Sequence, residues 1–270
     1  MDTTKNKATN NKKSISVFFP CYNDAGTIGV MVMRAMSVLK EVADDYEVCV
    51  INDGSKDDSA QILAEIAKIY PAHFRHVNRE RPSGYGGVIR GGIEMCTKEW
   101  FFYTDGDAQY DVRELRLLVE KMSNDVDVIN GYKLKRHDPF HRIVIGYAYQ
   151  YFIKLLFTLP IRDVDADFRL MRRKIFDTVK LEETTGAITF ELVKKIADAG
   201  FRFDEVPVHH FYRQYGTSQF FNFSRVARTL GQVLTWWWRL VIKKEAVREY
   251  AKKQRMTETQ ATTRTSAKTK

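Results

Sequence analysis

Residues 100–107 read Trp-Phe-Phe-Tyr-Thr-Asp-Gly-Asp, an aromatic run that ends in two acidic residues flanking a glycine. The run Trp100–Thr104 predicts a short buried strand, because aromatic side chains fit the pleated surface of a sheet. Asp105 and Asp107 then follow the strand's carboxyl end. Two such carboxylates repel each other unless a cation lies between them, and Mg²⁺ or Mn²⁺ favours carboxylate and phosphate oxygens. Gly106 allows a sharp turn and the close approach of a ligand.

Strand-like and helix-like segments alternate along the chain on both sides of this run. Further apolar runs predict strands at 15–19, 47–51, 74–77 and 126–130. Apolar positions at helical spacing predict helices at 27–43, 59–70, 87–96 and 115–122. This alternation predicts an α/β fold with a mixed, mostly parallel sheet flanked by helices. Ligands of such sheets bind beyond the carboxyl ends of the strands. The acidic residues expected there are Asp24, Asp53, Asp105 and Asp107.

Composition limits the classes of protein that fit. The 270 residues are 44% hydrophobic, which suffices for one sizeable α/β domain with appendages, or for two small domains. The formal net charge of +9 suits nucleotide phosphates, anionic lipid or nucleic acid, and equally a solvated basic surface. Three widely spaced cysteines, Cys21, Cys49 and Cys96, argue against a disulfide framework or a zinc site. The lysine-rich N-terminus does not resemble a secretory signal, and no long uncharged apolar run predicts a transmembrane helix.

Two glycine-containing turns supply further candidate binding groups. The segment 52–55, Asn-Asp-Gly-Ser, follows a strand and is either a simple turn or a place where Asp53 accepts hydrogen bonds from a nucleobase or ribose. The segment 81–87, Arg-Pro-Ser-Gly-Tyr-Gly-Gly, leads into a helix that carries Arg90. A glycine-rich helix start presents backbone amides to anions. It has neither a Walker ending nor a dinucleotide fingerprint, so ATP hydrolysis and dinucleotide binding are disfavoured.

The order and spacing of these motifs resemble the family 2 glycosyltransferases with the GT-A (Rossmann-like) fold. More narrowly, they resemble the dolichol-phosphate mannose synthase and polyprenyl-phosphate glycosyltransferase branch. The resemblance spans 14–222 and rests on the segments 20–24, 52–55, 84–91, 105–109, 131–133, 162–170 and 205–218. It implies a metal-dependent, inverting transfer of a sugar from a GDP- or UDP-sugar to a polyprenyl (dolichyl-type) phosphate at a membrane.

The resemblance also assigns roles to individual residues. Donor-binding residues are Pro20, Tyr22, Asp24, Asp53, Gly84, Arg90, Asp105 and Gly106. Ligands of the Mg²⁺ or Mn²⁺ ion are Asp105, Asp107 and Gln109. Acceptor or phosphate contacts are Lys133, Arg169, Arg213 and Ser218, with Asp163 and Arg169 as catalytic residues. Asp163 matches a carboxylate proposed as general base or acceptor orienter, and an anionic phosphate acceptor hardly needs a base. Departures such as Asp167, where glycine is usual, leave the acceptor open.

The chain divides into four segments. Disordered tails are expected at 1–13 and 246–270, a glycosyltransferase domain at 14–222 and an amphipathic helix at 223–245. The apolar face of that helix comprises Phe223, Val226, Leu230, Val233, Leu234, Trp237, Leu240 and Val241. Such a helix lies either on anionic lipid or against the core or a partner subunit. A lipid-linked acceptor favours peripheral contact with the cytoplasmic face of a membrane. The oligomeric state stays open.

Other functions are weighed against this one. The first alternative is transfer to a hydroxyl of a glycan, a protein or a small molecule. A processive synthase is disfavoured because the segment 232–236, Gln-Val-Leu-Thr-Trp, lacks the arginine of the Gln-x-x-Arg-Trp motif. A non-catalytic nucleotide-binding scaffold would be expected to have lost Asp53, Asp105 or Asp107. Nucleic-acid binding, suggested by the charge alone, has no accompanying recognition motif, so no nucleic-acid partner is expected.

Overall fold

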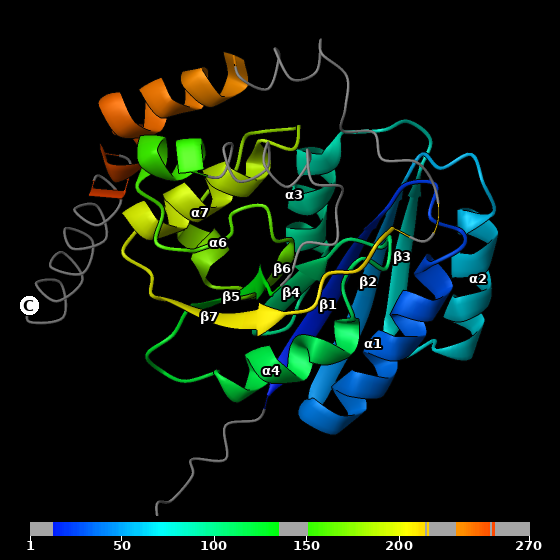
Figure 1. Cartoon of the computed structure of the whole chain (residues 1–270). Helices are drawn as coiled ribbons and strands as arrows, with labels where there is room; N and C mark the ends of the chain where they lie inside the picture. Colours follow the sequence, from blue (N-terminus) through cyan, green and yellow to red (C-terminus); the bar gives the residue numbers. More distant parts are fainter. Residues whose placement is uncertain (1–12, 135–150, 214, 216–230, 249, 252–270) are drawn as a thin grey trace, which may run out of the picture.

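The computed structural model describes residues 13–134, 151–213, 215, 231–248 and 250–251. Its centre is a seven-stranded sheet in the order β3-β2-β1-β4-β6-β5-β7 (Figure 1). The strands are β1 (Ser14–Cys21), β2 (Asp45–Asp53), β3 (Phe74–Arg79), β4 (Trp100–Thr104), β5 (Val128–Lys133), β6 (Phe168–Arg172) and β7 (Phe203–Val208). The predictions for Ser218, Phe223, Val226, Leu230 and most of both tails lie outside the described residues.

The helices predicted between the strands are confirmed. They are α1 (Ile28–Val42), α2 (Ser59–Ile69), α3 (Tyr85–Met95) and α4 (Leu115–Glu120), the last preceded by the 3₁₀ turn η1 (Val112–Glu114). Further along the chain come α6 (Ile175–Thr178), α7 (Ile188–Asp198) and the π-helical turn η2 (Trp238–Ile242). β1, β2 and β4 form because their apolar runs are buried on both faces of the sheet, as is typical of parallel sheets.

One strand runs against the others. β1 pairs in parallel with β2 and β4, whereas β6 is antiparallel to both β4 and β5, its neighbours on either side. β5 and β7 are again parallel. The amino end of β6 therefore lies at the same edge of the sheet as the carboxyl ends of β1, β2, β4, β5 and β7. Residues before β6 thus meet residues that follow the other strands.

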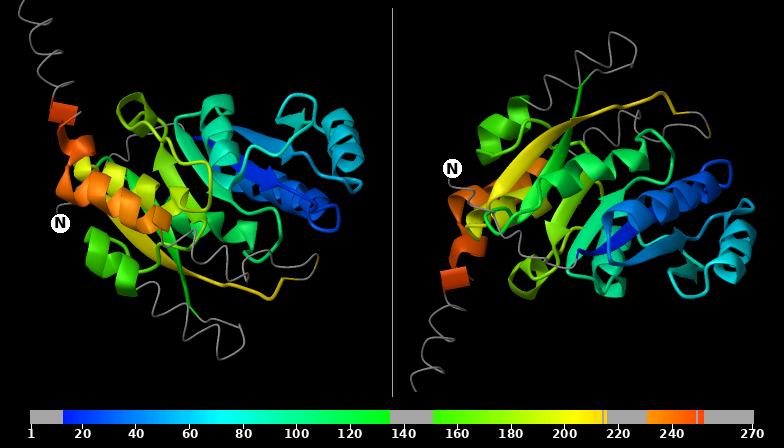
Figure 2. Two further views of the ribbon diagram at one scale, coloured as in Figure 1. Left: turned by 90° about the horizontal axis from the view of Figure 1, so that it is seen from above. Right: turned by 90° about the horizontal axis from the view of Figure 1, so that it is seen from below.

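Helices cover both faces of this sheet (Figure 2), and a hydrophobic core lies on each face. On one face, α1, α2 and α4 contribute buried apolar side chains to the first core, with α1 on β1 and β2 and α4 on β5 and β7. On the other, α3 packs on β1 and β2, and α6, α7 and the C-terminal helix (231–242) contribute side chains to the same second core. β1 serves both, since Val17 belongs to the first core and Phe18 to the second. α3 lies especially close to β1, because a Cβ on Gly92 would overlap the Phe18 ring.

The buried side of the C-terminal helix coincides only in part with its predicted apolar face. Val233, Trp236 and Leu240 are buried in the second core, while Leu234 is 53% exposed and Trp238 52% exposed. The buried stripe is thus rotated from the predicted one, because the large Trp236 ring reaches a polar partner inside the protein. The packed chain also extends past the expected boundary at 245, since Ala246 is 2% exposed. None of the described helices has the length and apolarity needed to cross a membrane.

Candidate active site

The strand ends bring most of the predicted site residues to one edge of the sheet (Figure 1). Asp24 follows β1, Asp53 ends β2, and Asp105 and Asp107 follow β4. Lys133 ends β5, and the segment from Asp163 to Asp167 leads into β6. This grouping follows directly from the topology, because β6 begins where its neighbours end. The edge therefore gathers carboxylates and cationic side chains from distant parts of the chain.

Asp105 is held by a tyrosine from α3. The Tyr85 hydroxyl donates a hydrogen bond of 2.8 Å to Asp105 Oδ1. Burial raises the pKa of Tyr85 well above its ordinary value, so this hydroxyl stays protonated and available as a donor. The turn behind Asp105 is also fixed, since Thr27 Oγ1 donates to the Gly106 carbonyl over 2.7 Å. A side chain at position 106 would press on the Pro20 carbonyl, which explains the glycine.

Negative charge accumulates at this edge. Burial raises the pKa of Asp105 well above its usual range, and the negative charges of Asp167 and Asp107 add to the effect. Burial likewise raises the pKa of Asp107 and of Asp167. Burial and the nearby Asp107 raise the pKa of Asp24 to about 6. Carboxylates whose charged forms are this unfavourable are suited to a divalent cation, which would remove the repulsion.

Arg213 partly balances this charge. Its Nη2 donates to Asp24 Oδ1 over 3.2 Å, and its Nη1 lies 3.8 Å from Asp107 Oδ2. The segment that carries Arg213 is anchored beside Gln109, whose carbonyl accepts the Phe211 N–H over 2.8 Å and whose side-chain amide donates to the Phe211 carbonyl over 3.2 Å. The predicted ligand Gln109 thus lies next to Asp107, to which its own backbone N–H donates.

Asp53 contacts the glycine-rich turn. Its two carboxylate oxygens accept hydrogen bonds of 2.8 Å from the backbone N–H and the hydroxyl of Ser83, and Arg79 lies 3.3 Å away. Tyr22, predicted to contact the donor, is 43% exposed at the same edge. Asp53, at the end of β2, therefore holds the turn before α3 by hydrogen bonds to Ser83. The turn lies next to the end of β2 for this reason.

Arg169 is fully buried within a network of protein partners. It lies opposite Tyr103 on β4 and Asn130 on β5, so all three side chains share one face of the sheet. Its Nε donates to Asn130 Oδ1 over 2.7 Å, and its Nη atoms donate to the Tyr103 hydroxyl and the Val164 carbonyl. Asp167 lies 3.4 Å from the same guanidinium. Arg169 is thus buried below the surface of the site and is not exposed to solvent there.

Lys133 and Asp163 lie together as predicted acceptor residues. Lys133 Nζ is 4.0 Å from Asp163 Oδ2 and donates to the Asp165 carbonyl over 3.2 Å. Asn130 also donates to the Asp163 carbonyl, over 3.3 Å. The start of β6 is therefore fixed against β5. A cation and a carboxylate lie side by side there, an arrangement that can hold a phosphate-bearing molecule and orient it.

The glycines before α3 serve close packing. Gly84 has a φ of +79°, and a Cβ there would strike the Thr184 carbonyl. The Gly86 N–H donates to that carbonyl over 3.0 Å, so this amide is not free for an anion as the sequence suggested. Arg90, further along the helix, approaches the Leu181 carbonyl at 3.5 Å. This part of the predicted donor site therefore rests on the loop 181–185.

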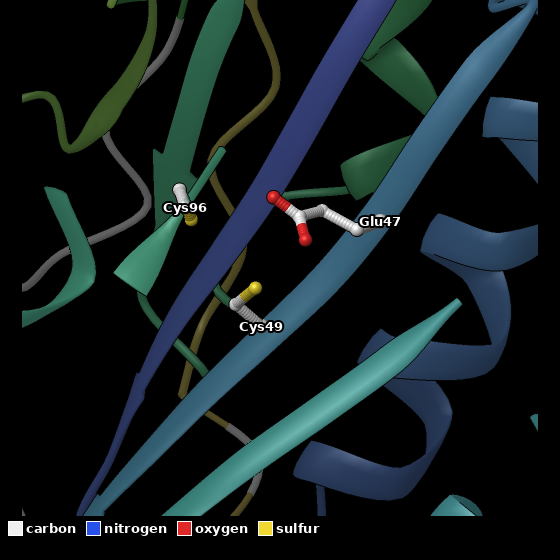
Figure 3. Close-up of side chains that lie close together, drawn as sticks. All are labelled: Glu47, Cys49 and Cys96. Atoms are coloured by element: carbon white, nitrogen blue, oxygen red, sulfur yellow. The ribbon is translucent and has the colours of Figure 1, made fainter. Parts of the chain in front are cut away.

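Elsewhere, one cluster resembles a metal site. Among the described residues, Glu47, Cys49 and Cys96 are the group of three possible ligands whose ligand atoms all lie within 4.8 Å of one another (Figure 3). The carboxylate of Glu47 already accepts hydrogen bonds from Ser16, Thr97 and Arg75. Burial alone would raise the pKa of Glu47, but these hydrogen bonds hold it below its usual range. Burial raises the pKa of Cys96, which favours the protonated thiol. The cluster is therefore a buried structural network.

Sequence reasoning missed some of the residues that shape the site. Tyr85 and Tyr103 hold Asp105 and Arg169 but lie 20 and 66 positions from them, so no local pattern reveals the contacts. Asp167 stood out as a departure from the resembled family. The structure makes it part of the acidic edge, where the Tyr103 hydroxyl donates to it over 3.1 Å. An aromatic residue inside a glycine-rich turn was the available signal for Tyr85.

Comparison with known proteins identifies the family and the fold. The sequence profile of Glycosyl transferase family 2 matches residues 16–180. Glucosyl-3-phosphoglycerate synthase from Mycobacterium tuberculosis, in complex with phosphoglyceric acid, has a TM-score of 0.60 at 14% identity, covering 84% of this chain and 79% of that chain. The complex of that enzyme with Mg²⁺ and uridine diphosphate has a TM-score of 0.60 at 16% sequence identity, with 82% of this chain and 77% of that chain covered. Its complex with Mn²⁺, uridine diphosphate and glucosyl-3-phosphoglycerate has a TM-score of 0.56 at 14% sequence identity, with the same shares covered.

These likenesses confirm the predicted GT-A fold, and the narrower dolichol-phosphate branch stays a prediction. The profile covers more than half of the sequence and includes β1 to β4, Asp53, Asp105 and Asp107. The chain therefore belongs to glycosyl transferase family 2.

Proposed function

We propose that this protein is a metal-dependent, inverting glycosyltransferase that takes a sugar from a nucleotide-sugar at the edge formed by Asp24, Asp105 and Asp107. The observation that carries the proposal is the pair Asp105 and Asp107 at the end of β4. The pKa values of both carboxyl groups are raised, and both residues lie within the segment that matches the family profile. Bound there, Mg²⁺ or Mn²⁺ would supply positive charge to the leaving diphosphate. The solved neighbours bind either ion together with uridine diphosphate.

Asp105, Asp107 and Gln109 would hold the ion. The Gln109 amide N–H donates to the Phe211 carbonyl, so the oxygen of that amide is its ligand atom. Hard divalent cations prefer such oxygen donors, and the donor's phosphates would complete the set. Tyr85 keeps Asp105 in place by its hydrogen bond of 2.8 Å.

The donor's nucleoside would lie over the ends of β1 and β2. Tyr22, with Pro20 before it, offers an exposed ring on which a base can stack. Asp53 would accept hydrogen bonds from the base or ribose while holding Ser83. Gly84, Gly106 and Arg90 would shape the pocket around the diphosphate. The uridine diphosphate bound by the solved neighbours makes a UDP-sugar the first donor to test, followed by a GDP-sugar.

The acceptor would carry a phosphate and approach from the side of β5 and β6. Lys133 beside Asp163 offers one cation to the acceptor. Arg213, which ends 3.2 Å from Asp24, offers a guanidinium fork suited to phosphate oxygens, those of the donor's diphosphate as well as those of the acceptor. Ser218, outside the described residues, is proposed to add a hydroxyl contact. Arg169 is proposed as a positioning residue, because its guanidinium already donates hydrogen bonds to Asn130, Tyr103 and Val164.

Within this class, we favour a polyprenyl phosphate as the acceptor, at the cytoplasmic face of a membrane. The C-terminal helix exposes Leu234, Trp238 and Ile242, and the helical segment 151–157 exposes Tyr151 and Leu155. Exposed aromatic and aliphatic side chains with lysines and arginines nearby suit an interface with anionic lipid. A small soluble acceptor with a hydroxyl group is the second candidate. The neighbour's complex with phosphoglyceric acid supports it, and Asp163 would then serve as the base.

One assay tests these proposals together. Nucleoside diphosphate release is measured across UDP- and GDP-sugars with Mn²⁺ or Mg²⁺, in the presence of a short-chain polyprenyl phosphate, of 3-phosphoglycerate, or of no acceptor. Release that depends on the polyprenyl phosphate supports the lipid acceptor, and release that depends on phosphoglycerate supports the hydroxyl acceptor and overturns the lipid one. Absence of release with every donor and metal would overturn the enzymatic proposal and leave nucleotide binding as the function.

A further inference from the structure

The C-terminal helix makes a buried polar contact beside the donor site. Trp236 is 5% exposed, and its indole N–H donates to Glu183 Oε2 over 2.6 Å. The Arg239 guanidinium lies 4.5 Å from the centre of the ring and the Lys195 ammonium 5.3 Å from it. A hydrogen bond to a carboxylate and two nearby cations fix the ring more firmly than apolar packing alone. The contact joins two elements 53 positions apart.

Glu183 in turn shapes the loop that contains it. Its Oε1 accepts the backbone N–H groups of Thr184 and Thr185, each over 2.8 Å. The Thr185 hydroxyl forms a further hydrogen bond of 3.3 Å with Gln232 of the C-terminal helix. Gln232 and Trp236 are the two ends of the segment that was compared with the processive synthases. Both therefore contact the same loop, 183–185.

This loop is packed tightly against the start of α3. The Thr184 carbonyl accepts the Gly86 N–H over 3.0 Å, and a Cβ on Gly84 or Gly86 would strike a carbonyl of the loop. No space remains for the two backbones to shift independently. Tyr85 lies between these two glycines, and its hydroxyl donates to Asp105. A displacement of the loop would thus move the group that orients Asp105.

We propose that Trp236 is a positioning residue for the donor's metal ion. Through Glu183 and the loop 183–185 it holds Tyr85 where the tyrosine hydroxyl orients Asp105. This inference rests on the proposed function, because the orientation of Asp105 affects catalysis only if Asp105 binds the metal. It also links the helix that exposes Leu234 and Trp238 to the reacting end of the site.

The test compares Trp236→Phe with Trp237→Phe. Both remove an indole N–H from neighbouring rings of the same helix, and only the first ring donates to Glu183. Mn²⁺ affinity is measured by electron paramagnetic resonance with and without UDP, below the thermal midpoint of each variant. We expect Trp236→Phe to weaken Mn²⁺ binding about tenfold and Trp237→Phe to leave it within about twofold. Glu183→Gln, which keeps the size of the side chain, should weaken it to a similar extent.

A double-mutant cycle separates this role from general destabilisation. In a Tyr85→Phe background, where the hydroxyl that orients Asp105 is gone, Trp236→Phe should cause almost no further loss of Mn²⁺ affinity. Wild-type affinity in both Trp236→Phe and Glu183→Gln, or an unchanged tenfold loss in the Tyr85→Phe background, would overturn the inference. A wild-type protein that neither binds Mn²⁺ nor turns over a nucleotide-sugar would overturn the proposed function as well, so the two failures are distinct.

Discussion

Arg213 donates a hydrogen bond of 3.2 Å to Asp24, a residue 189 positions earlier in the chain. The contact joins the segment after β7 to the loop after β1. The other terminal nitrogen of the same guanidinium lies 3.8 Å from Asp107 Oδ2. Arg213 therefore partly balances the negative charge of two carboxylates of the site. A metal ion bound by Asp107 would replace that charge and release the guanidinium to contact the phosphates of a substrate.

Arg213→Ala should therefore affect the binding of the metal ion and the binding of the nucleotide in opposite directions. Mn²⁺ alone should bind at least as tightly as to the wild type, because a competing positive charge is removed. UDP in the presence of Mn²⁺ should bind about 10- to 100-fold more weakly, since a charge-assisted hydrogen bond contributes about 1.5–3 kcal/mol. Calorimetric titration measures both. Arg213→Lys, which keeps the charge without the fork, should give an intermediate affinity for UDP. Unchanged UDP affinity in Arg213→Ala would contradict this account.

Asp24 should make the protein less stable as the pH rises. Its pKa is raised from 3.8 to about 6 in the folded state, so the folded protein holds this proton to a higher pH than the unfolded chain does. The free energy of unfolding therefore falls between about pH 4 and pH 6, and the cost is fully present above that range. Asp24→Asn should raise it at pH 7.5 by about 1–3 kcal/mol.

Urea unfolding of the wild type and Asp24→Asn at pH 4 and pH 7.5 measures this difference. The two proteins should have similar stability at the lower pH and diverge at the higher one. Asp125→Asn, at a side chain that is 88% exposed, serves as the control and should show no such divergence. A variant that is less stable than the wild type at pH 7.5 would refute the assignment.

Gly84→Ala should lower the free energy of unfolding more than Gly200→Ala does. Both glycines have a φ near +80°, so both substitutions incur the strain of a left-handed backbone, about 1–2 kcal/mol. A Cβ at Gly200 would meet no atom within 4 Å, whereas one at Gly84 would strike the Thr184 carbonyl. Gly84→Ala should lose about 1–3 kcal/mol more in the free energy of unfolding. Equal losses in urea unfolding would mean that α3 and the loop are not in tight contact.

Much of the fold could be predicted from the sequence where the local pattern decides the structure. β1, β2 and β4 are continuous apolar runs buried on both faces, so their existence and approximate ends are visible without a structure. The strand ends then locate Asp24, Asp53 and the Asp105–Asp107 pair correctly, because ligands of such sheets bind at that edge. The antiparallel insertion of β6 is a matter of long-range pairing and has no local signal.

The parts that could not be predicted depend on contacts between distant residues. Periodicity placed Leu234 and Trp237, but not Trp236, on the apolar face of the helix. Trp236 is nevertheless buried, because Glu183 gives its N–H a partner inside the protein. The resemblance predicts a phosphate contact for Arg169, and the structure shows its guanidinium hydrogen-bonded to Asn130 and Tyr103. Such hydrogen bonds between buried groups of distant residues are not recorded in a sequence pattern.

The measurement that most directly tests the account is nucleoside diphosphate release by the wild type and by Asp107→Ala, with Mn²⁺ and after chelation with EDTA. The exposed-site variant Asp125→Asn serves as the control. The account predicts release by the wild type and by Asp125→Asn that EDTA abolishes and Mn²⁺ restores, and a loss of at least about 100-fold in Asp107→Ala. Release by Asp107→Ala at the wild-type rate, or release that persists in EDTA, would contradict it.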